Sequence, residues 1–250
     1  MSSFQFRGLT VNYDIKGEGE PVLLLQGNTA SSGMFAPVIE EYANNFKVIT
    51  IDFPGHGKSD RLEQFETDFW YYNAMVCLAL LDETNTEKVT VIGTSGGALV
   101  ALNMGLEAPA RIKAIVADSF EGAYPLNTFI NDLKTDREEA KRNSDAVAFW
   151  QHNHGEDWEK IVDLDTDMLL RFAERGHSFF HKPIAELSVP TWLTGSREDE
   201  YCDYLEDIYL DLQKKNRRLK IYLFEKGGHP AMLSNHEQFL GLVRQWIVKL

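Results

Sequence analysis

Short apolar runs rich in β-branched residues alternate along the chain with longer segments of helical period. This alternation is typical of βαβ units, in which parallel strands are joined by helices. Several runs are apolar without interruption, such as residues 22–25 and 89–92. Uninterrupted apolar strands suit a sheet that helices cover on both faces. The sequence therefore predicts an α/β fold with a mostly parallel sheet.

The expected strands coincide with the apolar runs at residues 9–15, 21–26, 48–53, 89–93, 114–118, 191–195 and 218–225. The expected helices between them are residues 34–42, 69–81, 97–107, 201–212 and 237–249. Residues 121–187 differ, because they are rich in charged and aromatic residues and contain no convincing strand. With helical segments at 127–142 and 168–175, residues 121–187 are expected to form a helical cap, inserted into a core of residues 1–120 and 188–250.

Composition and charge indicate the size of the domain and which partners the chain disfavours. The 250 residues suffice for one large domain, and a hydrophobic share of 44% is ordinary for a globular chain. The formal net charge of −13 disfavours nucleic acid and anionic membranes as partners, because their phosphates repel an acidic chain. No stretch reaches the roughly 20 apolar residues of a membrane span, and the N-terminal segment has no apolar signal region. We expect a soluble, cytoplasmic monomer or homodimer that acts on a small molecule.

The segment Gly93-Thr94-Ser95-Gly96-Gly97 lies between an apolar run and a helical segment. It matches the pattern G-x-S-x-G in the strand–turn–helix context where this pattern holds a nucleophilic serine. In so sharp a turn, side chains two residues before and after the serine would clash with neighbouring chain, so glycines are needed there. The turn also places Ser95 at a helix N-terminus, where N–H groups favour negative charge. The alternatives are a purely structural turn and a phosphate-binding turn.

A serine nucleophile needs a general base, and the candidate is His229, which follows two glycines after the last expected strand. Its position gives the chain order serine, acid, histidine. The orienting acid should lie on the loop after residues 191–195, where Glu198, Asp199 and Glu200 are available. One carboxylate must accept the proton of the distal imidazole nitrogen, which fixes the tautomer and stabilises the imidazolium. We favour Asp199, then Glu198; Asp118, which also ends a strand, is a further alternative.

An acyl-transfer intermediate also needs N–H donors for its oxyanion. The N–H of Gly96 is one expected donor, because Gly96 directly follows the nucleophile. The second should come from the turn Gln26-Gly27-Asn28, and we assign it to the N–H of Asn28. The alternative is that this segment is only a polar turn.

With these motifs in place, the sequence resembles the α/β-hydrolase superfamily, in the sub-group of small cap-bearing serine hydrolases that includes esterases and C–C hydrolases. Residues 52–61, DFPGHGKSDR, are also similar to the D-x-P-G-x-G-x-S-D/R loop of that family. The resemblance covers most of the chain and is weakest in the expected cap. It implies the α/β-hydrolase fold with a mostly parallel eight-stranded sheet, and it is specific for fold and nucleophile but not for substrate.

Two departures from the family pattern concern the site. Gln26 stands where the family usually has His before the oxyanion turn, so the hydrogen bonding there must differ. The acid commonly lies three residues after the strand-end glycine, which is Glu198 here, whereas one inserted residue would make Asp199 the match. Because the nucleophile is Ser and not Asp, the resemblance does not imply dehalogenase or epoxide hydrolase chemistry.

Other patterns are weaker. The acidic segment 163–167 lacks the glycine of a calcium loop, and the histidines at 152, 154, 177 and 181 lack supporting carboxylate or cysteine spacing, so neither predicts a metal site. The two cysteines, Cys77 and Cys202, are expected to be free thiols. His56 is expected to be structural. The aromatic residues at 69–72 and 179–180 are expected in the core, with an apolar pocket as the alternative.

The leading expectation is hydrolysis of a small carboxylic ester, thioester or related acyl substrate. Ser95 attacks, His229 moves the proton, Asp199 orients His229, and water releases the acid from the acyl-enzyme. This mechanism requires no metal or cofactor. One alternative is a C–C bond hydrolase or lyase that uses the same triad. Another is a ligand-sensing protein with little turnover.

Overall fold

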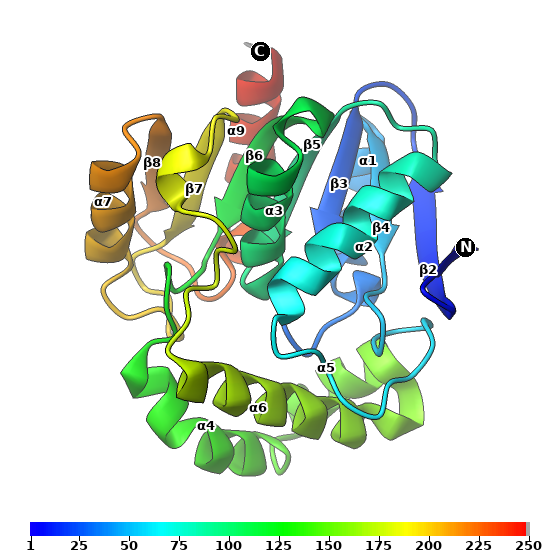
Figure 1. Ribbon diagram of the computed structural model, residues 1–250, viewed down its shortest axis with the longest axis vertical. Coiled ribbons are helices and arrows are strands. Elements are labelled where there is room, and N and C mark those ends of the chain that lie inside the picture. The colour runs from blue at the N-terminus through cyan, green and yellow to red at the C-terminus, as the bar shows by residue number, and fades with distance from the viewer. Residues whose placement is uncertain (249–250) are drawn as a thin grey trace.

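An eight-stranded sheet organises residues 1–248, the part of the chain that the computed structural model describes (Figure 1). The strand order is β1-β2-β4-β3-β5-β6-β7-β8; the six strands from β3 to β8 run parallel, and β2 is antiparallel to β1 and β4. The strands are β1 (Ser2–Phe6), β2 (Leu9–Lys16), β3 (Pro21–Leu25), β4 (Lys47–Ile51), β5 (Val89–Thr94), β6 (Ile112–Asp118), β7 (Thr191–Ser196) and β8 (Leu219–Phe224). The predicted α/β architecture is confirmed.

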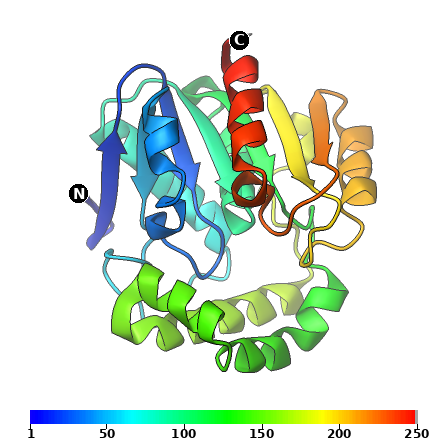
Figure 2. The same ribbon diagram turned by 180° about the vertical axis from the view of Figure 1, so that it is seen from behind.

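Helices cover both faces of this sheet (Figures 1 and 2). The helices are α1 (Ile39–Ala43), α2 (Phe69–Glu83), α3 (Gly96–Glu107), α4 (Asn127–Ala140), α5 (Ser144–His154), α6 (Trp158–Arg175), α7 (Leu205–Lys215), α8 (Ala231–Ser234) and α9 (His236–Val248). Helices α2, α3 and α7 pack on one face, and α1 and α9 pack on the other. Within the described residues, no helix combines the length and the apolar character that crossing a membrane requires.

The core is divided in two by the sheet, because successive side chains of a strand point to opposite faces. In β3, Leu23 and Leu25 belong to the apolar cluster under α2 and α3, whereas Val22 and Leu24 belong to the cluster under α1 and α9. All four side chains are fully buried. This burial on both faces explains why the strand is apolar without interruption.

Helices α4, α5 and α6 lie between β6 and β7 in the sequence and form a separate layer at one end of the sheet (Figures 1 and 2). We call these three helices the cap. The carboxyl ends of the parallel strands point toward it (Figure 1). Loops leaving those strand ends can therefore meet cap side chains.

The structure corrects the expected helices at several places. The helix expected at 34–42 is broken into a 3₁₀ turn, Ser32–Phe35, and α1, because Pro37 between them lacks the N–H that a helix needs. Helix α7 begins at Leu205 and not at 201, since the preceding residues form a turn around Asp199. Cap helix α5 was not expected, and α6 begins ten residues before the expected start at 168.

The ends of the chain add two smaller differences. Strand β1 was not expected; it pairs with β2 through a tight turn in which Arg7 and Gly8 both have positive φ values, 51° and 85°. Such turns match the twist of a hairpin. The helix expected at 237–249 is α9, and its expected last residue, Lys249, lies outside the described residues.

Candidate active site

Ser95 occupies a sharp turn between the end of β5 and the start of α3. Its φ of 55° and ψ of −126° lie where L residues are rarely found, which indicates local strain. A Cβ at Gly97 would overlap the carbonyl oxygen of Leu25, and one at Gly93 would overlap the carbonyl oxygen of Gly97. The close packing that the sequence predicts for this turn is therefore present.

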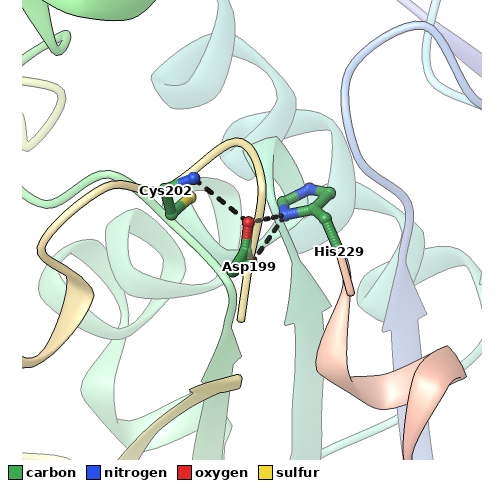
Figure 3. A group of neighbouring side chains, drawn as sticks. All are labelled: Asp199, Cys202 and His229. Atoms are coloured by element: carbon green, nitrogen blue, oxygen red, sulfur yellow. Dashed lines mark hydrogen bonds and ion pairs between the residues drawn. The ribbon is translucent and has the colours of Figure 1, made fainter. Parts of the chain in front are cut away.

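His229 and Asp199 approach each other from the loops that follow β8 and β7 (Figure 3). The Nδ1 atom of His229 lies 2.9 Å from Oδ2 and 3.1 Å from Oδ1 of Asp199. The Asp199 side chain is only 1% exposed, and its Oδ1 also accepts the N–H groups of Tyr201 and Cys202. Burial would raise the pKa of Asp199, but the hydrogen bonds and the charge of His229 lower it below the ordinary value. Asp199 is thus an ionised partner for the imidazole.

The other carboxylates weighed for the orienting role lie elsewhere. Glu198 is exposed, and Glu200 accepts the backbone N–H of His229 at 2.9 Å. Asp118 is fully buried at the end of β6, and burial raises its pKa to about 6. Its carboxylate accepts hydrogen bonds from the hydroxyls of Thr94 and Thr194 at 3.2 and 2.8 Å. Asp118 therefore joins the ends of β5, β6 and β7.

The turn after β3 lies directly beside the candidate nucleophile. A Cβ built on Gly27 would stand 3.4 Å from the Oγ of Ser95. A Cβ on Gly96 would overlap Oδ1 of Asn28, so the Asn28 side chain lies against Gly96. Ser95, Gly96, Asn28 and His229 all line one cavity. The structure thus brings together every residue that the sequence nominated for the site, with Asp199 behind His229.

The departure at Gln26 has a visible consequence. The side chain is fully buried, and within residues 1–248 neither its Oε1 nor its Nε2 has a hydrogen-bond partner. A buried amide without partners is energetically unfavourable. The turn keeps its position next to Ser95 without support from this side chain.

Support for the turn comes instead from the cap. The hydroxyl of Thr29 accepts hydrogen bonds from Arg137 at 3.3 Å and from the indole of Trp150 at 3.2 Å. The Oδ1 atom of Asn153 accepts hydrogen bonds from both the N–H and the hydroxyl of Ser31, at 2.8 and 2.9 Å. We call residues 28–33, which include the expected oxyanion donor Asn28, the oxyanion loop. Cap side chains that sequence reasoning did not nominate thus fix its conformation.

His154 adds a further link between the cap and the oxyanion loop. Its Nε2–H donates to the carbonyl oxygen of Thr29 at 3.0 Å, while its Nδ1 accepts the N–H of Gly57 at 3.1 Å. Burial lowers the pKa of His154 and so favours the neutral ring that this pair of bonds requires. Asp52 accepts the N–H of Ser32 at 2.9 Å. The family-like segment 52–61 therefore supports the same loop.

A buried ion pair lies behind these contacts. Arg137 of α4 donates to Asp165 of α6 at 3.0 Å, and the Asp165 side chain is fully buried. Burial raises the pKa of Asp165 to about 6, although the charge of Arg137 opposes that rise. The pair joins two cap helices at the position where Arg137 also meets Thr29.

The cavity above Ser95 has a volume of about 540 Å³. The cap contributes mainly apolar side chains to it, among them Phe129, Leu133 and Phe149. Of the aromatic residues at 69–72 and 179–180, Trp70 lines the cavity, whereas Phe69, Phe179 and Phe180 belong to the core. A concave, largely apolar site of this size suits a small organic molecule.

Of the remaining candidate groups, only Cys202 lines the cavity among the described residues. Residues 163–167 lie within α6, and His181 pairs with Glu107 at 3.1 Å. His56 is fully buried and stacks on Phe65, with ring centroids 4.8 Å apart. Both cysteines are free thiols; Cys77 is buried in the core and Cys202 lines the cavity.

Several known proteins with similar sequences are hydrolases. An (E)-2-((N-methylformamido)methylene)succinate hydrolase from Acinetobacter baylyi is 29% identical over 133 residues, which cover 52% of this chain and 48% of that protein. A pimeloyl-[acyl-carrier protein] methyl ester esterase from Chromobacterium violaceum is 31% identical over 134 residues, which cover 53% of this chain and 47% of the esterase. In these matches the chain spans about half the length of its relatives.

Solved structures and a family model extend the comparison. A meta-cleavage product hydrolase from Pseudomonas fluorescens superimposes with a TM-score of 0.79 at 20% identity, covering 100% of this chain and 98% of that one. At this identity the likeness shows a common fold. Residues 20–151 match the family model described as alpha/beta hydrolase fold, and this match exceeds half of the chain. Together with the sheet order and the serine turn, it shows that the chain belongs to the α/β-hydrolase fold family of hydrolases.

Proposed function

We propose that the protein is a serine hydrolase that cleaves a small carboxylic ester, thioester or related acyl substrate. The observation that carries the proposal is the half-buried hydrogen bond between His229 and Asp199, with His229 opening onto the cavity that Ser95 also lines. A serine in a strained strand–helix turn, a histidine and an ionised carboxylate are the parts that acyl transfer by a nucleophilic serine requires.

In the proposed reaction, the neutral ring of His229 donates its Nδ1–H to Asp199 and leaves Nε2 free to accept a proton. Ser95 Oγ attacks the carbonyl carbon while its proton passes to Nε2. The N–H groups of Asn28 and Gly96 hold the negative oxygen that forms. The leaving group departs with the proton from His229, and water then repeats the sequence on the acyl-enzyme.

The walls of the cavity support a small acyl substrate. Apolar side chains of the cap face Ser95 across about 540 Å³, and this space suits a small acyl or alcohol group. The esterase from Chromobacterium violaceum acts on a methyl ester, according to its name. We propose the same reaction class for this chain.

The test replaces the nucleophile. Ser95→Ala should lower kcat for p-nitrophenyl acyl esters on the order of 10⁴-fold or more and abolish labelling by a fluorophosphonate probe. Ser144→Ala, at the exposed start of α5, is the matched control and should keep both activities. Labelling that persists in Ser95→Ala would overturn the proposal.

A second candidate is cleavage of a C–C bond by the same three residues. It is favoured by the meta-cleavage product hydrolase that shares the fold over the whole chain. A panel that contains matched ester and diketone substrates separates the two reactions. Tight binding of a ligand without turnover of either class would indicate a sensing protein instead.

A further inference from the structure

Cys202 stands beside two members of the candidate triad and has no part in the proposed reaction. One donor atom each from Cys202, Asp199 and His229 can be chosen so that all three lie within 4.8 Å of one another. Figure 3 shows the Asp199 carboxyl between Cys202 and the His229 ring. In the described part of the chain, this is the only such group of three metal-binding side chains. Cys202 and His229 also line the cavity, which gives an ion access to them.

The chemistry of these donors suits a thiophilic dication. Zn²⁺ binds cysteine sulfur at about 2.3 Å and histidine nitrogen or carboxylate oxygen at about 2.0–2.2 Å, so tetrahedral ligand atoms lie roughly 3.5 Å apart. Nδ1 of His229 lies 2.9 Å from Oδ2 of Asp199, and one donor atom from each of the three residues lies within 4.8 Å of the other two, so the group is compact enough for this spacing.

The charges around the group favour a cation. The carboxyl groups of Asp118, Glu121 and Asp203 lie near enough to Cys202 to act on its charge, in addition to Asp199 itself. Burial raises the pKa of Asp118 to about 6 and that of Glu121 to about 7, so the negative charge of these two groups is complete only above neutral pH. Glu121 comes from the loop after β6 and also lines the cavity. A dication placed between Cys202 and His229 would therefore enter a region of negative potential.

We propose that Asp199, Cys202 and His229 form an inhibitory binding site for a thiophilic divalent cation such as Zn²⁺ or Cd²⁺. The bound ion takes the Nδ1 lone pair of His229 and a carboxylate oxygen of Asp199, and the sulfur of Cys202 completes the protein ligands. The fourth position opens onto the cavity. The inhibition rests on the proposed function, whereas the binding of the ion does not.

The inhibition follows from the imidazole tautomer. A neutral ring carries one proton, and a metal at Nδ1 places that proton on Nε2. Nε2 then has no lone pair for the proton of Ser95, so general-base catalysis stops. The proton balance is simple: the ring proton moves from Nδ1 to Nε2, and the Cys202 thiol releases one proton to solvent as its sulfur binds the ion.

The first experiment measures binding without turnover. Ser95→Ala protein is titrated with Cd²⁺ alone, and the ultraviolet absorbance of the cadmium–thiolate bond is recorded. We expect a band that saturates at one ion per chain. It should be lost when Cys202→Ala is added and retained when Cys77→Ala is added, because Cys77 is buried in the core. A band that persists without Cys202, or that is absent from the Ser95→Ala protein, overturns the site.

The second experiment measures inhibition in the active enzyme. Zn²⁺ should inhibit ester hydrolysis and EDTA should restore it. In Cys202→Ser the concentration for half inhibition should rise roughly tenfold or more, because one of three protein ligands is lost. Equal inhibition of Cys202→Ser would show that the ion acts through other groups and would overturn the proposal. If no ester is turned over, the cadmium titration still decides whether the site exists.

Discussion

The two halves of the candidate active site are held by different parts of the molecule. Ser95, Asp199 and His229 lie on loops that leave β5, β7 and β8, and the buried Asp118 joins the ends of neighbouring strands. The oxyanion loop, residues 28–33, is held largely by side chains of the cap. The nucleophile half thus depends on the sheet, and the oxyanion half depends on how the cap docks.

The two kinds of support determine what a substitution in each half should do to catalysis. In the sheet half, hydrogen bonds join strands that are already neighbours, so the geometry around Ser95 is fixed by the core. In the cap half, Ser31 meets Asn153 across 122 residues of sequence. A substitution in the sheet half should abolish catalysis. A substitution in the cap half should lower kcat and leave the nucleophile in place.

The largest effect is expected for Asp199→Asn. An amide at this position favours the wrong imidazole tautomer, so kcat should fall about 10⁴-fold while the fold is retained. Ester hydrolysis measures kcat, and circular dichroism measures whether the fold is retained. Glu198→Gln, an exposed neighbour on the same loop, is the matched control and should behave as the parent protein. Near-normal activity of Asp199→Asn would show that another group orients His229.

A pH-dependent effect on stability is expected from Asp118. Its pKa of about 6 in the folded protein lies above the ordinary value of 3.8, so the native state binds this proton more tightly than the unfolded chain does. The contribution is fully present below about pH 4 and is lost as the pH rises through 6, by up to about 3 kcal/mol. Urea unfolding of the parent protein and of Asp118→Asn from pH 4 to 7 gives the difference curve. Parallel curves would contradict the assignment.

A smaller effect is expected from loosening the cap half. Asn153→Ala removes the acceptor for two groups of Ser31, and kcat should fall roughly 10- to 100-fold because an oxyanion donor is misplaced. The control is Asn143→Ala, which removes the N-terminal capping bonds of the same helix. It should lower stability by about 1 kcal/mol and leave kcat unchanged. Equal kcat losses in both variants would mean that general loosening of α5 is responsible.

The smallest effect is expected at Gln26. Gln26→Met keeps the side-chain volume and removes two buried polar atoms that have no partner in residues 1–248. The free energy of unfolding should rise by about 1 kcal/mol, with kcat changed less than about twofold. Chemical denaturation and ester hydrolysis measure both. A clear loss of activity would reveal that the Gln26 amide supports the oxyanion loop after all.

The sheet and the candidate triad could be predicted because their signals are local. The serine turn occupies residues 93–97, and His229 and Asp199 directly follow apolar strands. The choice between Asp199 and Glu198 depended on the path of one loop. The usual spacing of the family points to Glu198, and only one inserted residue makes Asp199, which contacts His229, the match. Pro37 carried a local signal too, since it interrupts the helix expected at 34–42.

The support of the oxyanion loop could not be predicted in the same way. Arg137 and Asn153 look like ordinary polar residues of surface helices, and their partners Thr29 and Ser31 lie more than 100 residues away. Nothing in the sequence marks such pairs. His154 was weighed only as a possible metal ligand, because a histidine that bridges two backbone groups leaves no recognisable spacing.

The hydrogen bonds from the cap to Thr29 and Ser31 matter for engineering this protein. The helices that shape the cavity walls are also those that hold the oxyanion loop. Exchanging the cap for that of another hydrolase, to accept a different molecule, would therefore alter the turnover rate as well. A graft that transfers the positions equivalent to Arg137, Trp150, Asn153 and His154 unchanged should let the preferred substrate be redesigned separately from the speed of reaction.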